Sequence, residues 1–261
     1  MSQLKAWCDP VDQKIKANRL TVLSADPAKR TVAIEALAKE VPNHYSSPKR
    51  VARLLKRLGK DKAAAYIEQK LPTAATSRSG DLGEILATLY VAEFTPFGVS
   101  INRLRWKDHR EMAMRGEDIV AVQWDAAAGL RILKGESKSN ASLSTATVTK
   151  ARTALKHNNG RPTPHALSFL ADRLHEQGKH DLGNEVDEVQ LSKGIRRRFG
   201  TSHRGFERWI ERADSWARLR AAWRSIGRSR PGSVGSLACD REREGQKYRL
   251  DVSWARRSIL R

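Results

Sequence analysis

The chain has 261 residues, a length that suits one large domain or a core with small appendages and excludes a mini-protein. Forty-nine Lys plus Arg against 29 Asp plus Glu give a net charge of +20 and a pI near 10.4, which points to a polyanionic partner such as nucleic acid. Hydrophobic residues make up 39% of the chain, so the composition excludes a disordered basic tail.

Cysteine content and hydropathy predict a cytoplasmic protein. Cys8 and Cys239 are the only cysteines, and one disulfide would be a poor scaffold for a domain this large, so reduced thiols are expected. Neither cysteine has a second Cys or His at zinc-ligand spacing. Residues 1–10 lack the apolar core of a signal peptide, and the longest nearly apolar run, 85–92, is far shorter than a membrane span.

Residues 1–76 are predicted to form a small basic helical domain. Apolar residues recur with helical spacing, and prolines divide the segment into helices near 28–40, 48–58 and 60–70. Basic side chains crowd the second helix, which could lie along a phosphate backbone. A solvated basic face on a packed bundle is the alternative interpretation. The candidate nucleic-acid contacts of this domain are Arg50, Arg53 and Arg57.

Residues 77–163 are predicted to form the central α/β domain. A helix that begins near Ser79 continues through 85–92, a run so apolar on every side that it must be buried. Three strands are expected next, and the last two form a hairpin because a short Ala/Gly turn separates them. The strands span 99–106, 118–124 and 130–135, and a helix over 142–157 ends at Asn158, Asn159 and Gly160.

Residues 164–261 are predicted to form an Arg-rich, mostly helical region. Helices are expected over 165–178 and 204–227, with two strands within 234–254. The planar guanidinium of arginine binds phosphate oxygens bidentately, although an ordinary solvated charge run fits the pattern equally well. The candidate phosphate contacts here are Arg196, Arg197, Arg198 and Arg204. A stripe that recurs every seven residues, typical of core packing or of a partner interface, consists of Trp209, Trp216 and Trp223.

Residues with catalytic potential flank the predicted hairpin. Positions equidistant from a hairpin turn face each other, so a turn near Ala127 or Ala128 places Asp118 across from Glu136 or Lys138. Two carboxylates are hard oxygen ligands for Mg²⁺, for which Mn²⁺ can substitute, and the Lys138 ammonium would face the scissile phosphate or the attacking water. The arrangement predicts metal-dependent phosphodiester hydrolysis. A surface ion pair is the alternative.

Two further acids receive separate predictions. Glu84 is the only charged residue between Leu82 and Ala92, and at roughly 100° per residue it projects about 150° from the apolar stripe of its helix. It is therefore a candidate metal ligand or supporting residue, with capping of the helix N-terminus as the alternative. Glu117 should point away from Asp118 by strand alternation, which predicts a solvated side chain.

The order of these elements resembles the PD-(D/E)XK, or restriction-endonuclease-like, nucleases: a helix with Glu84, a strand, a strand that opens with Asp118, a strand ending in Glu136-Ser137-Lys138, and a helix. Four segments resemble, more narrowly, the nuclease subunit of Hachiman-type antiphage defence systems. They are Ser79-Gly80-Asp81-Leu82-Gly83-Glu84-Ile85-Leu86, Arg105-Trp106-Lys107-Asp108, Gly116-Glu117-Asp118 and Gly135-Glu136-Ser137-Lys138, within about residues 79–157.

This resemblance implies a metal-dependent DNase that acts with a helicase partner, on a core of helix, three-stranded mixed or antiparallel sheet, and helix. It implies catalytic roles for Asp118, Glu136 and Lys138, and for Glu84 as a further residue. The chain has no Gly-x-x-x-x-Gly-Lys-Ser/Thr phosphate loop, so ATP hydrolysis would belong to the partner. A non-catalytic DNA clamp for a helicase remains the alternative. A membrane-surface role is disfavoured because the basic segments lack exposed aromatic anchors.

Overall fold

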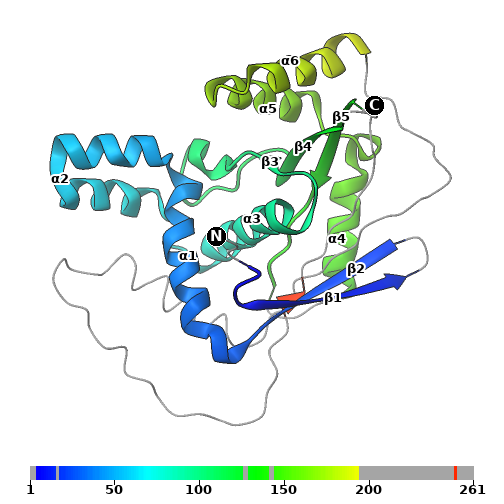
Figure 1. The fold of residues 1–261 in the computed structure, drawn as a ribbon. Coiled ribbons are helices and arrows are strands. Elements are labelled where there is room, and N and C mark those ends of the chain that lie inside the picture. The colour runs from blue at the N-terminus through cyan, green and yellow to red at the C-terminus, as the bar shows by residue number, and fades with distance from the viewer. Residues whose placement is uncertain (1–3, 16–17, 126–128, 141–143, 194–249, 252–261) are drawn as a thin grey trace.

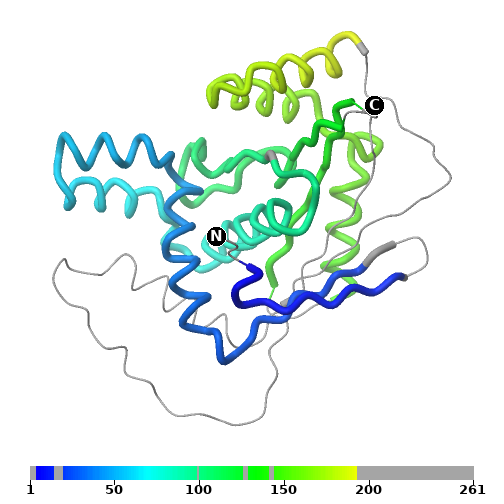
Figure 2. The backbone as a smooth tube through the Cα atoms, viewed as in Figure 1, coloured from blue at the N-terminus to red at the C-terminus, as the bar shows by residue number. Residues whose placement is uncertain are grey.

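The computed structural model describes residues 4–15, 18–125, 129–140, 144–193 and 250–251 (Figure 1). The fold is mixed α/β and mostly helical, with two small antiparallel sheets. Each sheet is chiefly one hairpin, to which a two-residue strand adds a short third member. The chain trace in Figure 2 places helix α3 (Ala75–Phe94) in the middle of the molecule, between the N-terminal elements and the second sheet.

The N-terminal segment contains a hairpin that the sequence analysis did not predict. Strands β1 (Cys8–Ile15) and β2 (Asn18–Ala25) pair antiparallel, and β6 (Leu250–Asp251) pairs with β2. The expectation of a purely helical segment was therefore wrong. Strand β1 exposes every side chain from Asp9 to Lys14, so it lacks the alternating apolar pattern that reveals a half-buried strand.

The three helices expected in this segment are confirmed. A short 3₁₀ turn, Pro27–Lys29, leads into α1 (Arg30–Tyr45), and α2 (Pro48–Lys70) follows. The backbone of α2 breaks at Gly59, where φ is 81°, a conformation that glycine adopts without a Cβ penalty. Its two halves correspond to the predicted helices and project together from the body of the protein (Figure 1).

The second sheet lies between two apolar clusters. It has the order β3 (Val99–Ser100), β4 (Ile119–Asp125) and β5 (Gly129–Gly135), all antiparallel. Alternate residues of β4 enter different clusters: Ile119 and Ala121 pack with α3 and the N-terminal elements, whereas Val120 and Val122 pack with the later helices. The first cluster contains residues from both sides of position 76. The domain boundary expected at that position stays a prediction.

The predicted first strand over 99–106 is wrong beyond its second residue. After Ser100 the chain leaves the sheet and forms a 3₁₀ turn, η2 (Arg103–Trp106). Arg103 and Leu104 are consecutive and both buried, whereas a strand would turn them to opposite faces of the sheet. The turn places Leu104 in the first cluster and brings Arg103 to α3.

Of the remaining described helices, those over 145–156 and 164–176 agree with the predictions, and a third, over 180–188, was not predicted. Helix α4 (Thr145–Lys156) is capped by the Ser144 hydroxyl, and a turn, η3 (His157–Gly160), ends it with positive φ at Asn158 and Asn159. Helices α5 (Pro164–Glu176) and α6 (His180–Glu188), and then a π turn (Val189–Lys193), cover the second cluster.

Several predictions concern residues outside the described part of the chain. They are the helix over 204–227, the two strands expected within 234–254 apart from the described residues 250–251, the tryptophan stripe, and Arg196, Arg197, Arg198 and Arg204. Among the described residues, no helix combines the length and apolar character that crossing a bilayer requires.

Candidate active site

Three of the predicted catalytic residues meet at the open end of the β4–β5 hairpin. The last paired residues are Ile119 and Gly135, so Asp118 and Glu136 occupy the next opposed positions. Asp118 Oδ2 accepts a hydrogen bond of 2.8 Å from the Ser137 backbone N–H. The Lys138 ammonium contacts Glu136 Oε1 and donates to the Ser137 carbonyl at 3.2 Å. The register therefore agrees with the prediction that pairs Asp118 with Glu136 rather than with Lys138.

Burial and neighbouring charges act on the carboxyl of Glu136. Glu136 is only 9% exposed, and burial raises the pKa of its carboxyl, as does the nearby negative charge of Asp118. The contact with Lys138 acts in the opposite direction. Two carboxylates that disfavour each other's charge are stabilised when a cation lies between them.

Helix α3 supports the segment that carries Glu136 and Lys138. A Cβ added to Gly83 would lie 2.9 Å from Ser137 Oγ and 3.1 Å from Ser139 Cβ. The hydroxyls of Ser79 and Ser139 are 2.9 Å apart, which makes a second contact one helical turn earlier. The glycine thus allows the helix to approach the segment after β5 closely enough to fix its path.

Glu84 lies in the middle of α3, so the alternative of an N-terminal cap is wrong: the helix begins at Ala75, earlier than predicted. Its side chain is 13% exposed, and its Oε1 is 3.9 Å from Nε of Arg103. Burial raises the pKa of Glu84 to about 8, with Arg103 opposing and Asp118 adding to the shift. Within the described residues, no three His, Cys, Asp or Glu side chains are grouped to share a metal ion, so Glu84 does not complete a three-carboxylate site.

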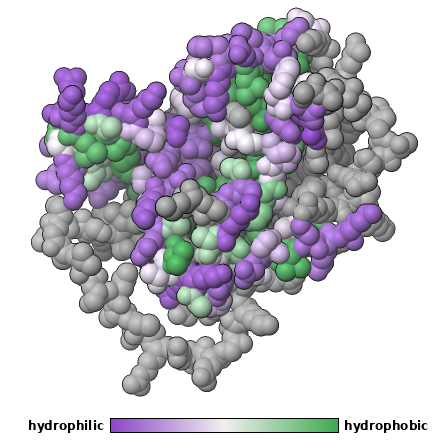
Figure 3. Space-filling view, in the orientation of Figure 1, coloured by the Kyte–Doolittle hydropathy of each residue, from purple (hydrophilic) through white to green (hydrophobic). Residues whose placement is uncertain are grey.

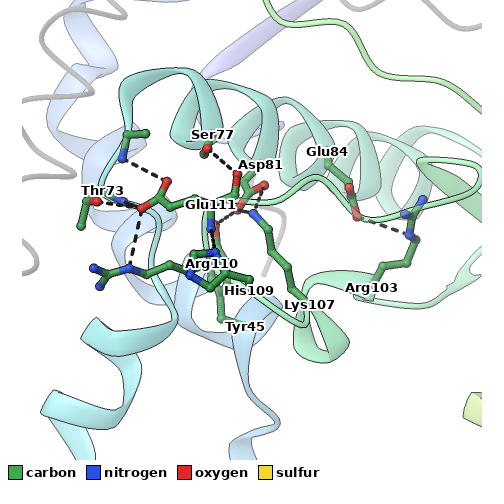
Figure 4. Close-up of polar contacts among 11 residues, drawn as sticks. Tyr45, Thr73, Ser77, Asp81, Glu84, Arg103, Lys107, His109, Arg110 and Glu111 are labelled. Carbon is green, nitrogen blue, oxygen red and sulfur yellow. Dashed lines mark hydrogen bonds and ion pairs between the residues drawn. The ribbon is translucent and has the colours of Figure 1, made fainter.

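A second buried ion pair lies one turn before Glu84 (Figure 4). The Lys107 ammonium donates to both carboxylate oxygens of Asp81, at 2.8 and 2.7 Å, and the Tyr45 hydroxyl donates to Oδ2 at 2.7 Å. Burial raises the pKa of Asp81, and the hydrogen bonds from Lys107 and Tyr45 oppose that shift. The sequence analysis assigned no role to these residues.

A sequence signal for this pairing existed. Asp81 and Glu84 are three residues apart on α3, and Arg103 and Lys107 are four apart, so acids and bases each recur with roughly helical spacing. The two ion pairs join α3 to the η2 turn side by side, as Figure 4 shows.

Glu111, which lies far away in sequence, holds the two residues that directly precede α3 (Figure 4). Its Oε1 accepts hydrogen bonds from the Thr73 backbone N–H and hydroxyl, at 2.6 and 2.7 Å, and its Oε2 accepts one from the Ala74 N–H at 3.2 Å. These hydrogen bonds, those from Thr73 above all, lower the pKa of Glu111 to about 2. Helix α3 is therefore fixed at its start by Glu111 and further along by the ion pairs of Asp81 and Glu84.

Glu117 is buried, and the prediction of a solvated side chain was wrong. The chain turns at Gly116, where φ is 90°, and Glu117 no longer follows the alternation of the strand. Its Oε1 lies 3.3 Å from the Lys134 ammonium and accepts from the Thr163 N–H at 2.8 Å, while its Oε2 accepts from the Thr163 hydroxyl at 3.0 Å. These hydrogen bonds, with the Lys134 charge, lower its pKa against the opposing effect of burial. Glu117 thereby anchors the start of α5.

The candidate DNA contacts of the N-terminal segment lie on α2. Arg50, Arg53 and Arg57 are all exposed, and the Arg50 guanidinium lies over the Tyr66 ring, 4.8 Å from its centre. The same projection exposes two leucines, Leu55 at 45% and Leu58 at 59%. Figure 3 shows an apolar area on α2 bordered by hydrophilic residues. Because the three arginines are exposed, a polyanion could reach them without a rearrangement of α2.

Comparison with known proteins identifies the family. The sequence profile described as HamA matches residues 1–204, a range that contains the hairpin corner and both buried ion pairs. A curated relative, "Hachiman protein HamA" from Bacillus cereus, is 28% identical over 174 residues, which cover 65% of this chain and 62% of the relative. The chain thus spans less than two thirds of that relative's length. Because the profile covers well over half of the sequence, the chain belongs to the HamA family.

Proposed function

We propose that this protein is a metal-dependent DNA nuclease that acts in Hachiman antiphage defence. The observation that carries the proposal is the corner formed by Asp118, Glu136 and Lys138, two opposed carboxylates with an ammonium beside them. Membership of the HamA family and the printed name of the curated relative support the defence role. The order of α3, sheet and α4 supports a restriction-endonuclease-like core.

The donor set of the corner fits a hard divalent cation. Asp118 and Glu136 would hold Mg²⁺, or Mn²⁺ in its place, while water and phosphate oxygens would supply the other ligands. When bound, such an ion polarises the phosphorus centre and lowers the pKa of bound water. Burial and the neighbouring charge of Asp118 raise the pKa of Glu136, and a cation between the two carboxylates would offset their repulsion.

The protein's own residues would orient the substrate and balance its charge. Lys138 would leave Glu136 for the phosphate and stabilise the negative charge that develops on its non-bridging oxygens. The Ser137 N–H fixes the orientation of Asp118. Glu84, which is buried and influenced by the charge of Asp118, would act as a supporting acid beside Arg103.

The proposed partners are DNA and a helicase subunit, and the proposed location is the cytoplasm. The net charge of +20 supports a polyanionic substrate. The proposed DNA contacts are Arg50, Arg53 and Arg57 on the exposed side of α2, and Arg196, Arg197, Arg198 and Arg204 beyond the described residues.

A non-catalytic DNA clamp for a helicase is the second candidate. It is favoured by the contact between Lys138 and Glu136, which is also what a purely structural ion pair would make, and by the lack of a third acid at the corner among the described residues. The two functions differ in metal dependence, because a clamp needs no Mg²⁺ to bind DNA.

The test is cleavage of supercoiled and linear DNA by the purified chain, alone and with any helicase encoded beside it, in Mg²⁺, Mn²⁺ or EDTA. The variants are Glu136→Gln and Lys138→Met, with Asp108→Asn, which alters an exposed acid, as the matched control. We expect metal-dependent cleavage that both site variants abolish and the control retains, with DNA binding kept throughout. Binding without cleavage in every condition would favour the clamp.

A further inference from the structure

A long stretch directly after Glu136 contains no carboxylate. Between Ser137 and Ala171 there is neither Asp nor Glu, although the chain as a whole carries 29 of them. The same stretch contributes five basic residues: Lys138, Lys150, Arg152, Lys156 and Arg161. A segment of one charge sign therefore begins at the corner that the two carboxylates define.

Helix α4 presents the middle of this stretch to solvent. Ala151 and Leu155 are its buried residues, so they define its inner side. The exposed side carries only hydroxyl, methyl and cationic side chains, which are Thr145, Ala146, Thr149, Lys150, Arg152, Thr153 and Lys156. None of the large hydrophobic side chains that the described residues expose lies on α4. This composition fits a phosphate backbone better than an apolar protein groove or a membrane.

The helix is anchored to the hairpin that carries the candidate site. The buried Lys134 ammonium donates to the carbonyls of His157 and Arg161, at 3.0 and 3.2 Å, just beyond the C-terminal end of α4. Lys134 precedes Glu136 by two residues, and its ion-pair partner Glu117 directly precedes Asp118. The position of α4 relative to the corner is therefore set by buried contacts rather than by a free linker.

We infer that the exposed face of α4 binds the phosphate backbone of the DNA that the corner cleaves. The inference rests on the proposed nuclease function, and it assigns a DNA-contact surface separate from the arginines of α2. Lys150, Arg152 and Lys156 make the phosphate contacts, and the lack of acids on either side removes the repulsion that a carboxylate would exert on the strand. Such contacts orient the duplex without reading its sequence.

The test uses the full-length chain and the charge-removing double variant Lys150→Gln/Lys156→Gln. Binding to a DNA duplex is followed by fluorescence anisotropy in EDTA, across a series of salt concentrations. The matched control is Lys39→Gln/Lys179→Gln, which removes two exposed lysines of other elements. Because each phosphate contact contributes roughly 0.9 to the slope of log affinity against log salt, the α4 variant should lower that slope by about 1.8. The control should match the wild type.

The outcomes separate this inference from the proposed function. A reduced slope in the α4 variant alone supports the DNA surface, and an α4 slope equal to that of the wild type overturns it. The Mg²⁺-dependent cleavage assay with Glu136→Gln decides the nuclease proposal independently, because the anisotropy measurement involves no catalysis. Circular dichroism of the α4 variant confirms that the helix content is retained, so that a lost contact is not mistaken for unfolding.

Discussion

The Lys107 ammonium donates hydrogen bonds to both carboxylate oxygens of Asp81, and the two side chains are only 4% and 8% exposed. This pair joins α3 to the turn that follows β3, and the Glu84–Arg103 pair joins the same two elements one helical turn further on. The tighter pair has a third partner in the Tyr45 hydroxyl, whereas Arg103 Nη1 has no hydrogen-bond partner among the described residues. The Asp81–Lys107 pair is therefore structural, whereas Arg103 holds Glu84 less tightly.

Loss of the Lys107 charge should destabilise the fold. Lys107→Met leaves the Asp81 carboxylate buried with only Tyr45 as a partner, and breaking a buried pair in this way costs about 3–5 kcal/mol. The double variant Asp81→Asn/Lys107→Met should lose less, because no unpaired charge remains. Urea unfolding of the single and double variants measures the difference. A single variant as stable as the wild type would contradict the assignment.

The buried Glu84 should make stability depend on pH. Folding raises the pKa of its carboxyl from 4.5 to about 8, chiefly by burial, so the folded state binds the proton more tightly than the unfolded state. The wild type must then lose stability as the pH rises from about 4.5 towards 8.

Glu84→Gln imitates the protonated acid and should not show this loss. We expect the stability of the variant relative to the wild type to increase as the pH rises through that window. Urea unfolding at a series of pH values measures it, and a difference that stays constant would refute burial of the charge. If Glu84 supports catalysis, the same variant should be slower in DNA cleavage even where it is the more stable protein.

The hydrogen bonds that Glu111 accepts ahead of α3 should show the opposite pH dependence. Hydrogen bonds from Thr73 lower the pKa of its carboxyl from 4.5 to about 2, so the stabilisation is complete above 4.5 and disappears as the pH falls towards 2. Glu111→Gln keeps an acceptor oxygen but removes the charge that strengthens these hydrogen bonds, so it should lower stability near neutral pH. Thermal unfolding should show this cost shrinking in acid. Glu35→Gln, which removes an exposed carboxylate of α1, is the matched control.

Much of the fold was predictable because helices and a tight hairpin carry local signals. Helix α4 and the β4–β5 hairpin follow from periodicity and turn residues close in sequence. The β1–β2 hairpin was missed because one of its strands exposes nearly all of its side chains, and the first predicted strand was too long because a 3₁₀ turn buries two consecutive residues, Arg103 and Leu104.

Of the candidate site, the part that lies within one hairpin was predictable, and the contacts between distant elements were not. The pairing of Asp118 with Glu136 depends only on hairpin register, which the turn sets. The burial of Glu117 and the partnership of Asp81 with Lys107 depend on contacts across 46 and 26 residues. For Asp81 and Lys107, the spacing of acids and bases suggests two matching pairs, but which residues meet depends on how the two elements pack.

A methyl group at Gly83 should impair the candidate site more than the fold. In Gly83→Ala the new Cβ would lie 2.9 Å from Ser137 Oγ and 3.1 Å from Ser139 Cβ, so the Ser137 hydroxyl and the chain at Ser139, on either side of Lys138, must shift. Gly80→Ala, in the same helix, is the matched control, because nothing lies within 4 Å of its added Cβ. That control should stabilise the helix by roughly 0.5–1 kcal/mol, since alanine is the better helix former.

We therefore expect Gly83→Ala to lose DNA cleavage while retaining the circular dichroism spectrum of a folded protein, and Gly80→Ala to cleave like the wild type. Cleavage rates in Mg²⁺ and urea midpoints for both variants, measured side by side, distinguish a displaced site from a destabilised helix. Equal cleavage by the two variants would mean that the close approach of α3 to Ser137 and Ser139 does not position the residues of the corner.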